Sequence, residues 1–506
     1  MILILDYGSQ YTQLIARKIR AMGVYTEIFP PDLPREAALS HEPAGIVLSG
    51  GPSSVYAKGA PRLQDWVLEA GVPVLGICYG MQLLALAHKG AVARSNKREY
   101  GPARIRLRVK SPLLEGLSST QQVWMSHGDK VEELPEGFRR LADSENCPVA
   151  AMAHKKQPYF GIQFHPEVFH TEQGDRWLKN FVQGICRART DWTMGDFIEH
   201  EVAKVREQTA GQRIVCAVSG GVDSSVMAAL LHRAVGDRLM CVLVDNGLLR
   251  LGEVDHVKRM FSELGIRLKV SRASKKFLGE LAGVTDPEEK RRRIGRVFIE
   301  VFMPHLKPGD FLAQGTLYPD VIESVSTHGP SATIKTHHNR VKEVLDLIRQ
   351  GRVVEPLREL FKDEVRAVGR LLGVPKDTLG RHPFPGPGLA VRVLGEVTPQ
   401  RLKKLREADA ILVEELRAAG EYDNIWQAFV VLLPVQSVGV MGDSRSYENV
   451  AAVRCVTSTD GMTADWYGLP RPVLARISNR IINEVAGINR VVYDVSSKPP
   501  ATIEWE

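Results

Sequence analysis

Residues 72–88 read VPVLGICYGMQLLALAH, a short apolar strand that turns abruptly into an apolar helix beginning near Met81. Strand-length apolar runs also occur at Ile2–Leu5 and Gly45–Leu48, and Tyr11–Met22 between them has a helical pattern. Apolar strands that alternate with helices are typical of an α/β domain whose sheet is doubly wound and mostly parallel. We therefore predict such a domain at the start of the chain.

The same pattern begins again further along the chain. Arg213–Val218 reads as a strand and is followed by a helix over about 224–235. Leu239–Val244 and Phe311–Ala313 are further strand candidates. Between the two patterns, Ile185–Met194 is polar and lacks core periodicity, which favours a linker. A second doubly wound domain is therefore predicted.

A third region begins at residues 381–388, RHPFPGPG, where proline and glycine interrupt regular structure. A compact α+β pattern follows and ends in KPPATIEWE at 498–506. We therefore predict two doubly wound, mostly parallel-sheet α/β domains, over residues 1–187 and 188–381, and a small C-terminal α+β domain over 382–506.

Composition narrows the class of protein. The chain has 506 residues and a formal charge of +7, which is mild for a nucleic-acid binder of this size and suits small anionic substrates. The densest basic run, Lys290–Arg293, is more often a solvated helix face than a site. Six cysteines without a C-x-x-C pair argue against a zinc knuckle and fit a reducing cytoplasm. The N-terminus is not a signal peptide, and no unbroken apolar segment predicts membrane insertion.

The strand-to-helix turn places Cys78 between Gly76 and Gly80, the elbow arrangement that presents a nucleophile. The helix N-terminus points partial positive charge at the sulfur and so favours the thiolate. Further along, GIQFHPE at 161–167 reads as a strand, and residues two apart in a strand project to the same side. His165 is then a base for Cys78, and Glu167 orients the imidazole. The alternatives are a small buried cysteine and a structural histidine.

Acyl chemistry also requires donors to the oxyanion. The backbone amide of Tyr79 is the first candidate, and Gly51 in the SGGP segment after a strand is the second, although a glycine pair also suits a tight turn. The Gly-x-Cys-x-Gly turn with a later His-Pro-Glu resembles the class I glutamine amidotransferases. The resemblance implies a glutaminyl thioester at Cys78 and release of ammonia. It also suggests that Gln82 lies near the glutamine, with Ser126–Asp129 as a nearby loop that brings Asp129 to it.

A second site is predicted at SGGVDSS, residues 219–225, between a strand and a helix. Consecutive small residues let several backbone N–H groups converge on an anion, although a plain Gly/Ser turn has the same composition. The segment lacks the Gly-Lys-Ser/Thr ending of a Walker loop and resembles the pyrophosphatase loop of the N-type ATP pyrophosphatases. That resemblance implies that the loop binds the pyrophosphate of ATP and that Asp223 holds Mg²⁺.

Other residues near this loop are ATP candidates because they follow strands, where open sheets bind nucleotides. Asp320–Glu323 belongs to the same group. Lys335–His338 and Lys362 are candidate cations for the leaving pyrophosphate, and a structural salt bridge is the alternative for Lys362. The predicted ATP-binding residues are Ser219, Gly220, Gly221, Val222, Asp223, Ser224, Ser225, Val244, Gly315 and Lys362.

The C-terminal third is similar to the dimerisation domain of the GMP synthetase family in three segments: residues 382–388, 438–443 and 498–506. With the other two domains in matching order, the resemblance covers essentially the whole chain. The resemblance implies a ligase whose substrates are glutamine, ATP and xanthosine monophosphate (XMP) and whose cofactor is Mg²⁺. It also implies that the protein is a cytoplasmic homodimer. The nucleotide-binding residues that it implies are Arg291, Gln427, Arg490, Lys498, Ile503 and Glu504.

The implied reaction aminates XMP to GMP through an adenylated intermediate and leaves AMP, pyrophosphate and glutamate. Two other hypotheses remain at this stage. An RNA-modifying enzyme of the pyrophosphatase-loop group would show salt-sensitive RNA binding. A regulatory protein built on the same folds would bind nucleotides without any catalysis.

Overall fold

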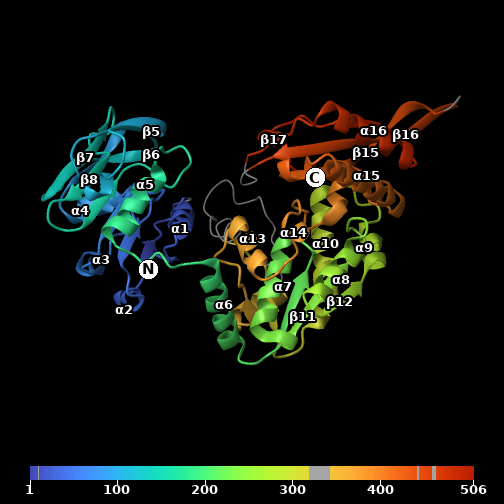
Figure 1. Cartoon of the computed structure of the whole chain (residues 1–506), viewed down its shortest axis with the longest axis horizontal. Coiled ribbons are helices and arrows are strands. Elements are labelled where there is room, and N and C mark those ends of the chain that lie inside the picture. The colour runs from blue at the N-terminus through green and yellow to red at the C-terminus, as the bar shows by residue number, and fades with distance from the viewer. Residues whose placement is uncertain (10, 318–341, 442–443, 459–462) are drawn as a thin grey trace. The chain divides into compact units, whose positions relative to one another are not determined.

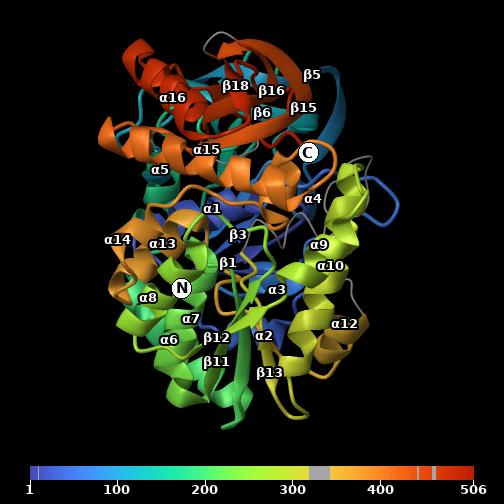
Figure 2. The same cartoon turned by 90° about the vertical axis from the view of Figure 1, so that its right-hand side faces the viewer.

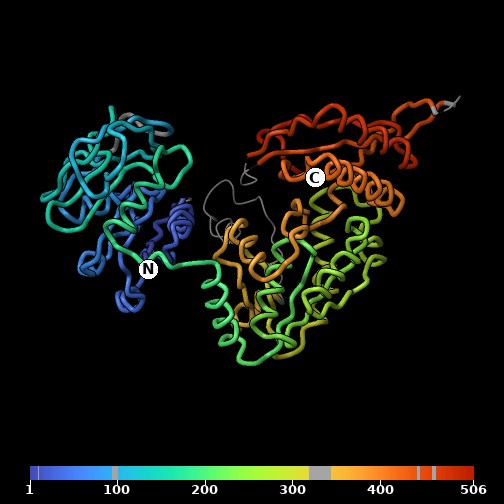
Figure 3. Tube along the Cα trace, viewed as in Figure 1, coloured from blue at the N-terminus to red at the C-terminus, as the bar shows by residue number. Residues whose placement is uncertain are grey.

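The computed structural model describes residues 1–9, 11–317, 342–441, 444–458 and 463–506. Its contacts divide the chain into two compact units, Met1–Asp196 and Phe197–Glu506, and the chain passes from one to the other once (Figure 3). The three-domain division expected from the sequence stays a prediction. Within the described residues, no helix is both long and apolar enough to span a membrane.

The first unit contains a nine-stranded mixed sheet (Figure 1). Its strands are β1 (Ile2–Leu5), β2 (Thr26–Phe29), β3 (Gly45–Leu48), β4 (Val74–Ile77), β5 (Ala91–Leu107), β6 (Thr120–Glu133), β7 (Phe138–Ser144), β8 (Ala151–His154) and β9 (Tyr159–Ile162). Its helices are α1 (Thr12–Ala21), α2 (Arg35–Leu39), α3 (Asp65–Glu69), α4 (Tyr79–Ala87), the 3₁₀ turn η1 (Pro112–Leu114), α5 (Gly174–Lys179) and the π-helical η2 (Asn180–Ile185).

The strand order of this sheet is β2-β1-β3-β4-β9-β8-β7-β5-β6. The half from β2 to β9 is parallel, and the half from β9 to β6 is antiparallel. Every residue of β1 is buried, because Ile2 and Ile4 enter the apolar core on one face of the sheet while Leu3 and Leu5 enter the core on the other. A parallel strand covered on both faces is expected to be apolar throughout.

The second unit contains a fully parallel sheet of order β12-β11-β10-β13-β14 and a C-terminal sheet (Figure 2). The strands of the parallel sheet are β10 (Ile214–Val218), β11 (Leu239–Asp245), β12 (Leu268–Arg272), β13 (Phe311–Ala313) and β14 (Val353–Val354). The helices around it are α6 (Met194–Thr209), α7 (Val222–Val235), η3 (Gly236–Arg238), α8 (Glu253–Glu263), α9 (Ser274–Leu281), α10 (Pro287–Phe302), η4 (Met303–His305), α12 (Lys342–Arg349), α13 (Lys362–Leu371) and α14 (Lys376–Leu379).

In the C-terminal sheet, β16 pairs antiparallel with β15 and β17 and parallel with β18, while α15 lies along β15. Its elements are η6 (Gly388–Arg392), α15 (Pro399–Ala418), η7 (Tyr422–Asn424), β15 (Gln427–Met441), β16 (Ser444–Thr457), β17 (Asp465–Trp466), α16 (Arg471–Glu484) and β18 (Ile488–Tyr493). One apolar cluster runs from Val215 in β10 to Ile488 in β18, so the parallel sheet and the C-terminal sheet share a core. The predicted fold class, two α/β sheets and a smaller α+β region, is confirmed.

Candidate active sites

The predicted nucleophile lies on a sharp turn between β4 and α4. Cys78 has φ +50° and ψ −104°, a backbone conformation that side chains rarely adopt outside functional sites. A Cβ on Gly80 would lie 2.4 Å from the carbonyl oxygen of Leu48, and one on Gly76 would lie 2.5 Å from the carbonyl carbon of Gly80. The flanking glycines are therefore required by close backbone approach, as the elbow pattern predicts.

His165 and Glu167 are both buried beside this turn. The Nδ1 atom of His165 lies 2.7 Å from Oε1 of Glu167. Burial acts to lower the pKa of His165, but the negative charge of Glu167 and the interactions with Cys78 and Glu167 outweigh it, and the pKa lies well above its usual value. An imidazolium beside the sulfur stabilises a thiolate, so the geometry suits nucleophilic attack.

The segment that carries these two residues is not the strand expected from the sequence. Strand β9 ends at Ile162, and His165 follows in irregular backbone. The main-chain N–H of His165 donates to the carbonyl of Trp124 at 3.0 Å, and Thr171 Oγ1 donates to the carbonyl of His165 at 2.6 Å. Pro166 has no N–H with which to continue a strand ladder, so these local contacts hold the histidine instead.

The oxyanion candidates also lie at the elbow. Tyr79 is the first residue of α4, so its amide is among those without an acceptor in the helix. The Tyr79 side chain is engaged elsewhere, because its hydroxyl donates to the carbonyl of Pro61 at 2.7 Å. A Cβ on Gly51 would lie 3.2 Å from the Tyr79 ring and 2.8 Å from the carbonyl oxygen of Tyr7, so Gly51 packs directly on the residue after the nucleophile.

The predicted glutamine-binding residues Gln82 and Asp129 meet through one hydrogen bond from a side chain to the main chain. Gln82 is buried, and its Nε2 donates to the backbone carbonyl of Asp129 at 2.8 Å. The expectation that Ser126–Asp129 forms a loop is wrong: the segment lies inside β6, because pairing with β5 overrides its turn-forming residues. Gln163 is not among the predicted site residues, yet its buried amide donates to the Cys78 sulfur at 3.6 Å. Its only sequence signal is a polar residue directly after an apolar strand.

In the second unit, the predicted pyrophosphate loop joins β10 to α7. Val222–Ser225 form the first turn of α7, with Gly221 as its N-cap. Ser219 and Ser224 hold the loop together: Ser219 N donates to Ser224 Oγ at 3.2 Å, and Gly221 N donates to Ser219 Oγ at 3.3 Å. Gly220 has φ +77°, and a Cβ there would lie 2.4 Å from Val257. A helix N-terminus with several small residues is suited to bind an anion.

Asp223 and Lys362 lie together beside this loop, with Nζ of Lys362 3.6 Å from Oδ2 of Asp223. Within the part of the chain that the structure describes, Oδ1 of Asp223 is buried and has no hydrogen-bond partner. An unpartnered carboxylate oxygen fits Mg²⁺, which takes few protein ligands and completes its shell with phosphates and water. No group of three or more His, Cys, Asp or Glu among the described residues is placed to hold a metal by itself.

The remaining ATP candidates occupy the ends of neighbouring strands. Val244 is buried near the end of β11, and Gly315 follows β13, where a Cβ on the glycine would lie 3.7 Å from the Met227 side chain of α7. Because β11 and β13 flank β10, the structure brings both ends to the loop side of the sheet. The candidates Asp320–Glu323 and Lys335–His338 lie outside the described residues.

Three of the nucleotide-binding candidates gather near the C-terminal residues. Glu504 accepts two hydrogen bonds from Arg392, at 3.1 and 2.8 Å, and one from Gln427 at 2.7 Å. Arg392 is fully buried, and its guanidinium lies over the Phe429 ring at 4.2 Å. Ile503 is buried in a small apolar cluster that includes Phe429. Three donor groups thus fix the position of the Glu504 carboxylate, whose oxygens can also accept from a donor group of a ligand.

The basic run on α10 is not simply a solvated face. Lys290 is fully buried and donates to the Glu506 side chain and to the carbonyl of Val393 at 2.8 Å, which the sequence did not predict because a lysine is rarely buried unless paired. Arg291 donates to the backbone oxygen of Glu506, close to the same C-terminal segment. Arg292 does lie on the exposed face, paired with a glutamate of its own helix.

Two other candidates lie elsewhere on the C-terminal sheet. Arg490 is in β18, and its Nε donates to Ser437 Oγ at 2.6 Å. Ser437 is ten residues along β15 from Gln427, a separation on the order of 30 Å for an extended strand. Within one chain the structure therefore does not bring Arg490 to Gln427. Lys498 lies beside Ala464, with which it exchanges two main-chain hydrogen bonds.

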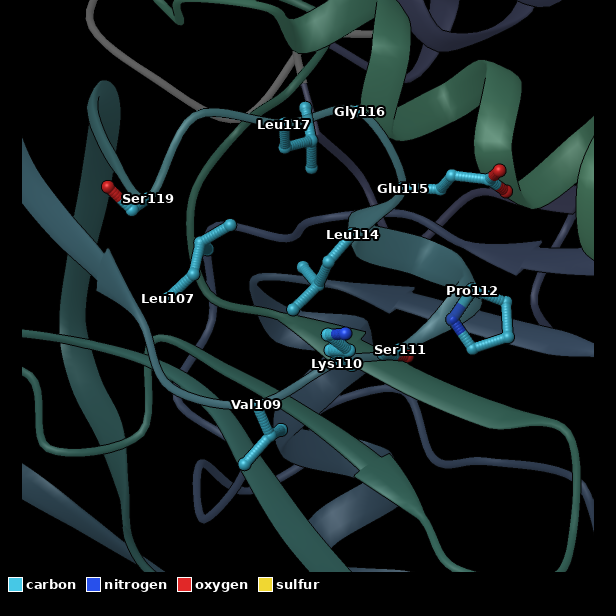
Figure 4. Close-up of a pocket in the computed structure, with 10 residues that line it drawn as sticks. All are labelled: Leu107, Val109, Lys110, Ser111, Pro112, Leu114, Glu115, Gly116, Leu117 and Ser119. Atoms are coloured by element: carbon cyan, nitrogen blue, oxygen red, sulfur yellow. The ribbon is translucent and has the colours of Figure 1, made fainter.

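The first unit also has a surface hollow between Leu107 and Ser119 (Figure 4). Its lining residues come from one segment of the chain, which begins at the last residue of β5 and includes η1. None of its ten lining residues is a predicted site residue, so the hollow has no part in the sites described above.

Comparison with known proteins gives three family matches in the same order along the chain as the three regions expected from the sequence. The family of class-I glutamine amidotransferases matches residues 3–185, NAD synthase matches 193–278, and the GMP synthase C-terminal domain matches 414–505. The chain is similar over its whole length to proteins named GMP synthase [glutamine-hydrolyzing]. That of Wolinella succinogenes is 56% identical over 513 residues, covering 100% of this chain and 98% of the relative. That of Aquifex aeolicus is 54% identical over 510 residues, covering 100% and 99%. The chain therefore belongs to the family of glutamine-hydrolysing GMP synthases.

Proposed function

We propose that this chain makes GMP from XMP, ATP and glutamine, with ammonia produced in the first unit and consumed in the second. The observation that carries the proposal is the presence, in one chain of this family, of a Cys–His–Glu site and a pyrophosphate-type loop. The first is built for amide hydrolysis, and the second for binding the phosphates of ATP.

In the first unit, Cys78 Sγ attacks the side-chain amide carbon of glutamine. His165 transfers a proton to the departing nitrogen, which leaves as ammonia, and water then releases glutamate from the thioester. The amides of Tyr79 and Gly51 stabilise the oxyanion. Glu167 holds the imidazole at 2.7 Å and stabilises its charged form.

In the second unit, the 2-oxo oxygen of XMP attacks the α-phosphorus of ATP, and pyrophosphate leaves. Ammonia then adds at the purine 2-position, and AMP departs with the oxygen. The amides of Gly221 and Val222 bind the leaving pyrophosphate together with Lys362. Asp223 would hold Mg²⁺, which when bound would neutralise phosphate charge. The salt bridge between Lys362 and Asp223 supports both predicted roles of Lys362, because the ammonium lies next to a residue of the loop.

We place the nucleotide of XMP at the C-terminal segment. The Glu504 carboxylate, fixed by Arg392 and Gln427, accepts from the purine N–H, and Ile503 packs on the ring. Arg291, Lys498 and Arg490 are the phosphate candidates. Since Arg490 lies far along the sheet from Gln427, it meets the nucleotide of the same chain only if the sheet is rearranged.

The proposed homodimer is supported by apolar side chains on the long strands. Val438 is 54% exposed, Val440 is 76% exposed and Tyr447 is 62% exposed. Val438 pairs directly with Tyr447 across the two strands, so these residues share one face of the sheet. An exposed apolar face of this kind is typical of a subunit interface. The free cysteines of the described structure fit the reducing cytoplasm.

The proposal is tested by incubating the protein with glutamine, ATP and XMP and measuring GMP, AMP and pyrophosphate together. The three products are expected in equal amounts. Cys78→Ala is expected to abolish synthesis from glutamine and to leave synthesis from added ammonia unchanged. Formation of ADP in place of AMP, or an unaltered purine, would show the proposed function to be wrong.

A further inference from the structure

A side chain far along the sequence holds the backbone of the pyrophosphate loop. Arg381 Nη1 donates to the carbonyl oxygen of Gly220 at 3.3 Å, and Nη2 donates to Oε2 of Glu253 at 2.6 Å. The Arg381 side chain is 16% exposed, and that of Glu253 is 7% exposed. The guanidinium thus bridges the loop and the first residue of α8 from a mostly buried position.

The contact with Gly220 bears directly on the groups that bind an anion. In a trans peptide unit, the carbonyl of one residue and the N–H of the next point in opposite directions. Holding the Gly220 carbonyl therefore fixes the direction of the Gly221 N–H, which points to Ser219 Oγ at 3.3 Å. This 3.3 Å hydrogen bond is long, so a phosphate oxygen can replace the serine as acceptor.

Gly220 also packs closely against α8. It has positive φ, and a Cβ on it would lie 2.4 Å from Val257 and 2.9 Å from the carboxylate of Glu253, so no side chain fits. A glycine by itself does little to fix the Gly220–Gly221 peptide, since glycine restricts φ and ψ least of all residues. The hydrogen bond from the Arg381 guanidinium to the Gly220 carbonyl limits the rotation of this peptide instead. A planar fork can serve both acceptors at once, whereas a lysine ammonium is a point charge on a flexible chain.

The residues after Arg381 contact the proposed nucleotide site. His382 Nδ1 accepts from the amide of Ala428 at 3.2 Å, and the carbonyl of Pro383 accepts from Gln427 Nε2 at 3.2 Å. The Phe384 ring lies 5.2 Å from the guanidinium carbon of Arg392. Arg381 thus contacts the pyrophosphate loop, while Pro383 contacts the nucleotide-binding candidate Gln427. Phe384 contacts Arg392, which holds the candidate Glu504.

We infer that Arg381 is a positioning residue of the pyrophosphate loop: it sets the Gly220–Gly221 peptide so that its N–H is oriented for pyrophosphate before ATP binds. The inference rests on the proposed function of the loop. Arg381 does not touch the reacting atoms, and its effect passes through the backbone of Gly220 and through Glu253.

The test measures ammonia-driven GMP synthesis for the parent and for Arg381→Lys and Arg381→Met. ATP is varied at saturating XMP, and XMP is varied at saturating ATP. Removal of a hydrogen bond to a charged donor changes binding by about tenfold. We expect KM for ATP and the inhibition constant of pyrophosphate to rise about tenfold in both variants, while KM for XMP changes less than threefold. Arg233→Ala is the matched control, because Arg233 lies at the far end of α7 in an exposed ion pair with Glu199.

Thermal unfolding separates positioning from general loss of structure. Arg381→Lys keeps the charge and most of the side-chain volume, so its melting temperature should stay near that of the parent even if Arg381→Met fails to fold. Unchanged KM for ATP and unchanged pyrophosphate inhibition in a folded Arg381→Lys protein would overturn the inference. So would an equal rise in KM for XMP. Failure of the parent to make GMP is a separate outcome, which refutes the proposed function instead.

Discussion

Acid should weaken the second unit through His382, a buried residue whose two ring nitrogens are both engaged. Its Nδ1 accepts from the amide of Ala428 at 3.2 Å, so Nε2 must carry the proton that it donates to the carbonyl of Tyr422 at 2.9 Å. The ring stacks on Tyr422 at 3.8 Å between centroids. Protonation of Nδ1 would turn this atom into a donor that faces the N–H of Ala428, so the Ala428 amide would lose its acceptor.

The pKa of His382 reflects this environment. Burial lowers it from the usual 6.5 to about 4, and the charges of Arg250 and Arg417 act in the same direction, against the hydrogen bond to Tyr422. Between these two pH values the unfolded chain binds a proton that the folded chain does not, so a fall in pH favours unfolding. The contribution of neutral His382 to stability is therefore fully present above pH 6.5 and is lost as the pH falls to about 4.

The size of the effect follows from the same values. One pKa unit corresponds to about 1.4 kcal/mol, so a fall from 6.5 to about 4 amounts to roughly 3 kcal/mol of unfolding free energy. Other groups also titrate in this range, so the prediction concerns a difference between two proteins. The parent should lose roughly 3 kcal/mol more than His382→Gln between pH 7 and pH 4, because the glutamine side chain does not titrate.

Hydrogen exchange followed by mass spectrometry measures the pH dependence of local stability around His382. The peptide that contains Ala428 should lose protection roughly 100-fold more in the parent than in His382→Gln over this pH range, after correction for the intrinsic exchange rate. Peptides from β1 in the first unit are the internal control and should show the same pH dependence in both proteins. Equal pH dependence at Ala428 in the two proteins, or titration of His382 itself near pH 6.5 by NMR, would refute the reasoning.

Three further predictions concern the other features. Glu167→Gln removes the charge that stabilises the His165 imidazolium, so glutamine-driven synthesis should fall about a thousandfold while ammonia-driven synthesis stays; a loss of less than threefold contradicts the triad. Gly80→Ala places a Cβ 2.4 Å from the carbonyl oxygen of Leu48 and should destabilise the first unit by about 2 kcal/mol in thermal unfolding. Gly184→Ala, where no atom lies within 4 Å of the added Cβ, should have little effect. Equal effects of the two substitutions would contradict the packing argument. Val440→Asp should shift the proposed dimer to monomer by light scattering, and a dimer that persists would place the interface elsewhere.

The strands could be predicted wherever burial on both faces makes the sequence apolar throughout. β1, β3, β10 and β13 lie at or within one residue of the expected positions. The antiparallel half of the first sheet could not be predicted, because strand partners depend on contacts between distant segments that a local pattern does not contain. The position of His165 shows the same limit: spacing suggested a strand, while hydrogen bonds to Trp124 and Thr171 set the actual backbone.

The site residues divide in a similar way. Cys78 and the pyrophosphate loop have local signatures, since the chemistry requires small residues at a strand-to-helix turn. Lys290 and Arg381 have none, because their importance comes from burial against segments more than 100 residues away. Burial of a charge requires partners that only the folded chain supplies.

The elbow has a further consequence. Cys78 N donates to the carbonyl of Ile162 at 2.8 Å, and Gly80 N donates to the carbonyl of Ser49 at 3.0 Å, so the turn is tied to the segments on both sides of β4. One neighbour continues to His165 and the other to Gly51. The candidate nucleophile, its proposed base and the proposed oxyanion donors therefore lie on segments that leave three adjacent strands at the same edge of one sheet. Their mutual alignment depends on the register of β3, β4 and β9 and on the local hydrogen bonds that hold His165. An apolar substitution in these strands is therefore expected to impair turnover before it unfolds the protein.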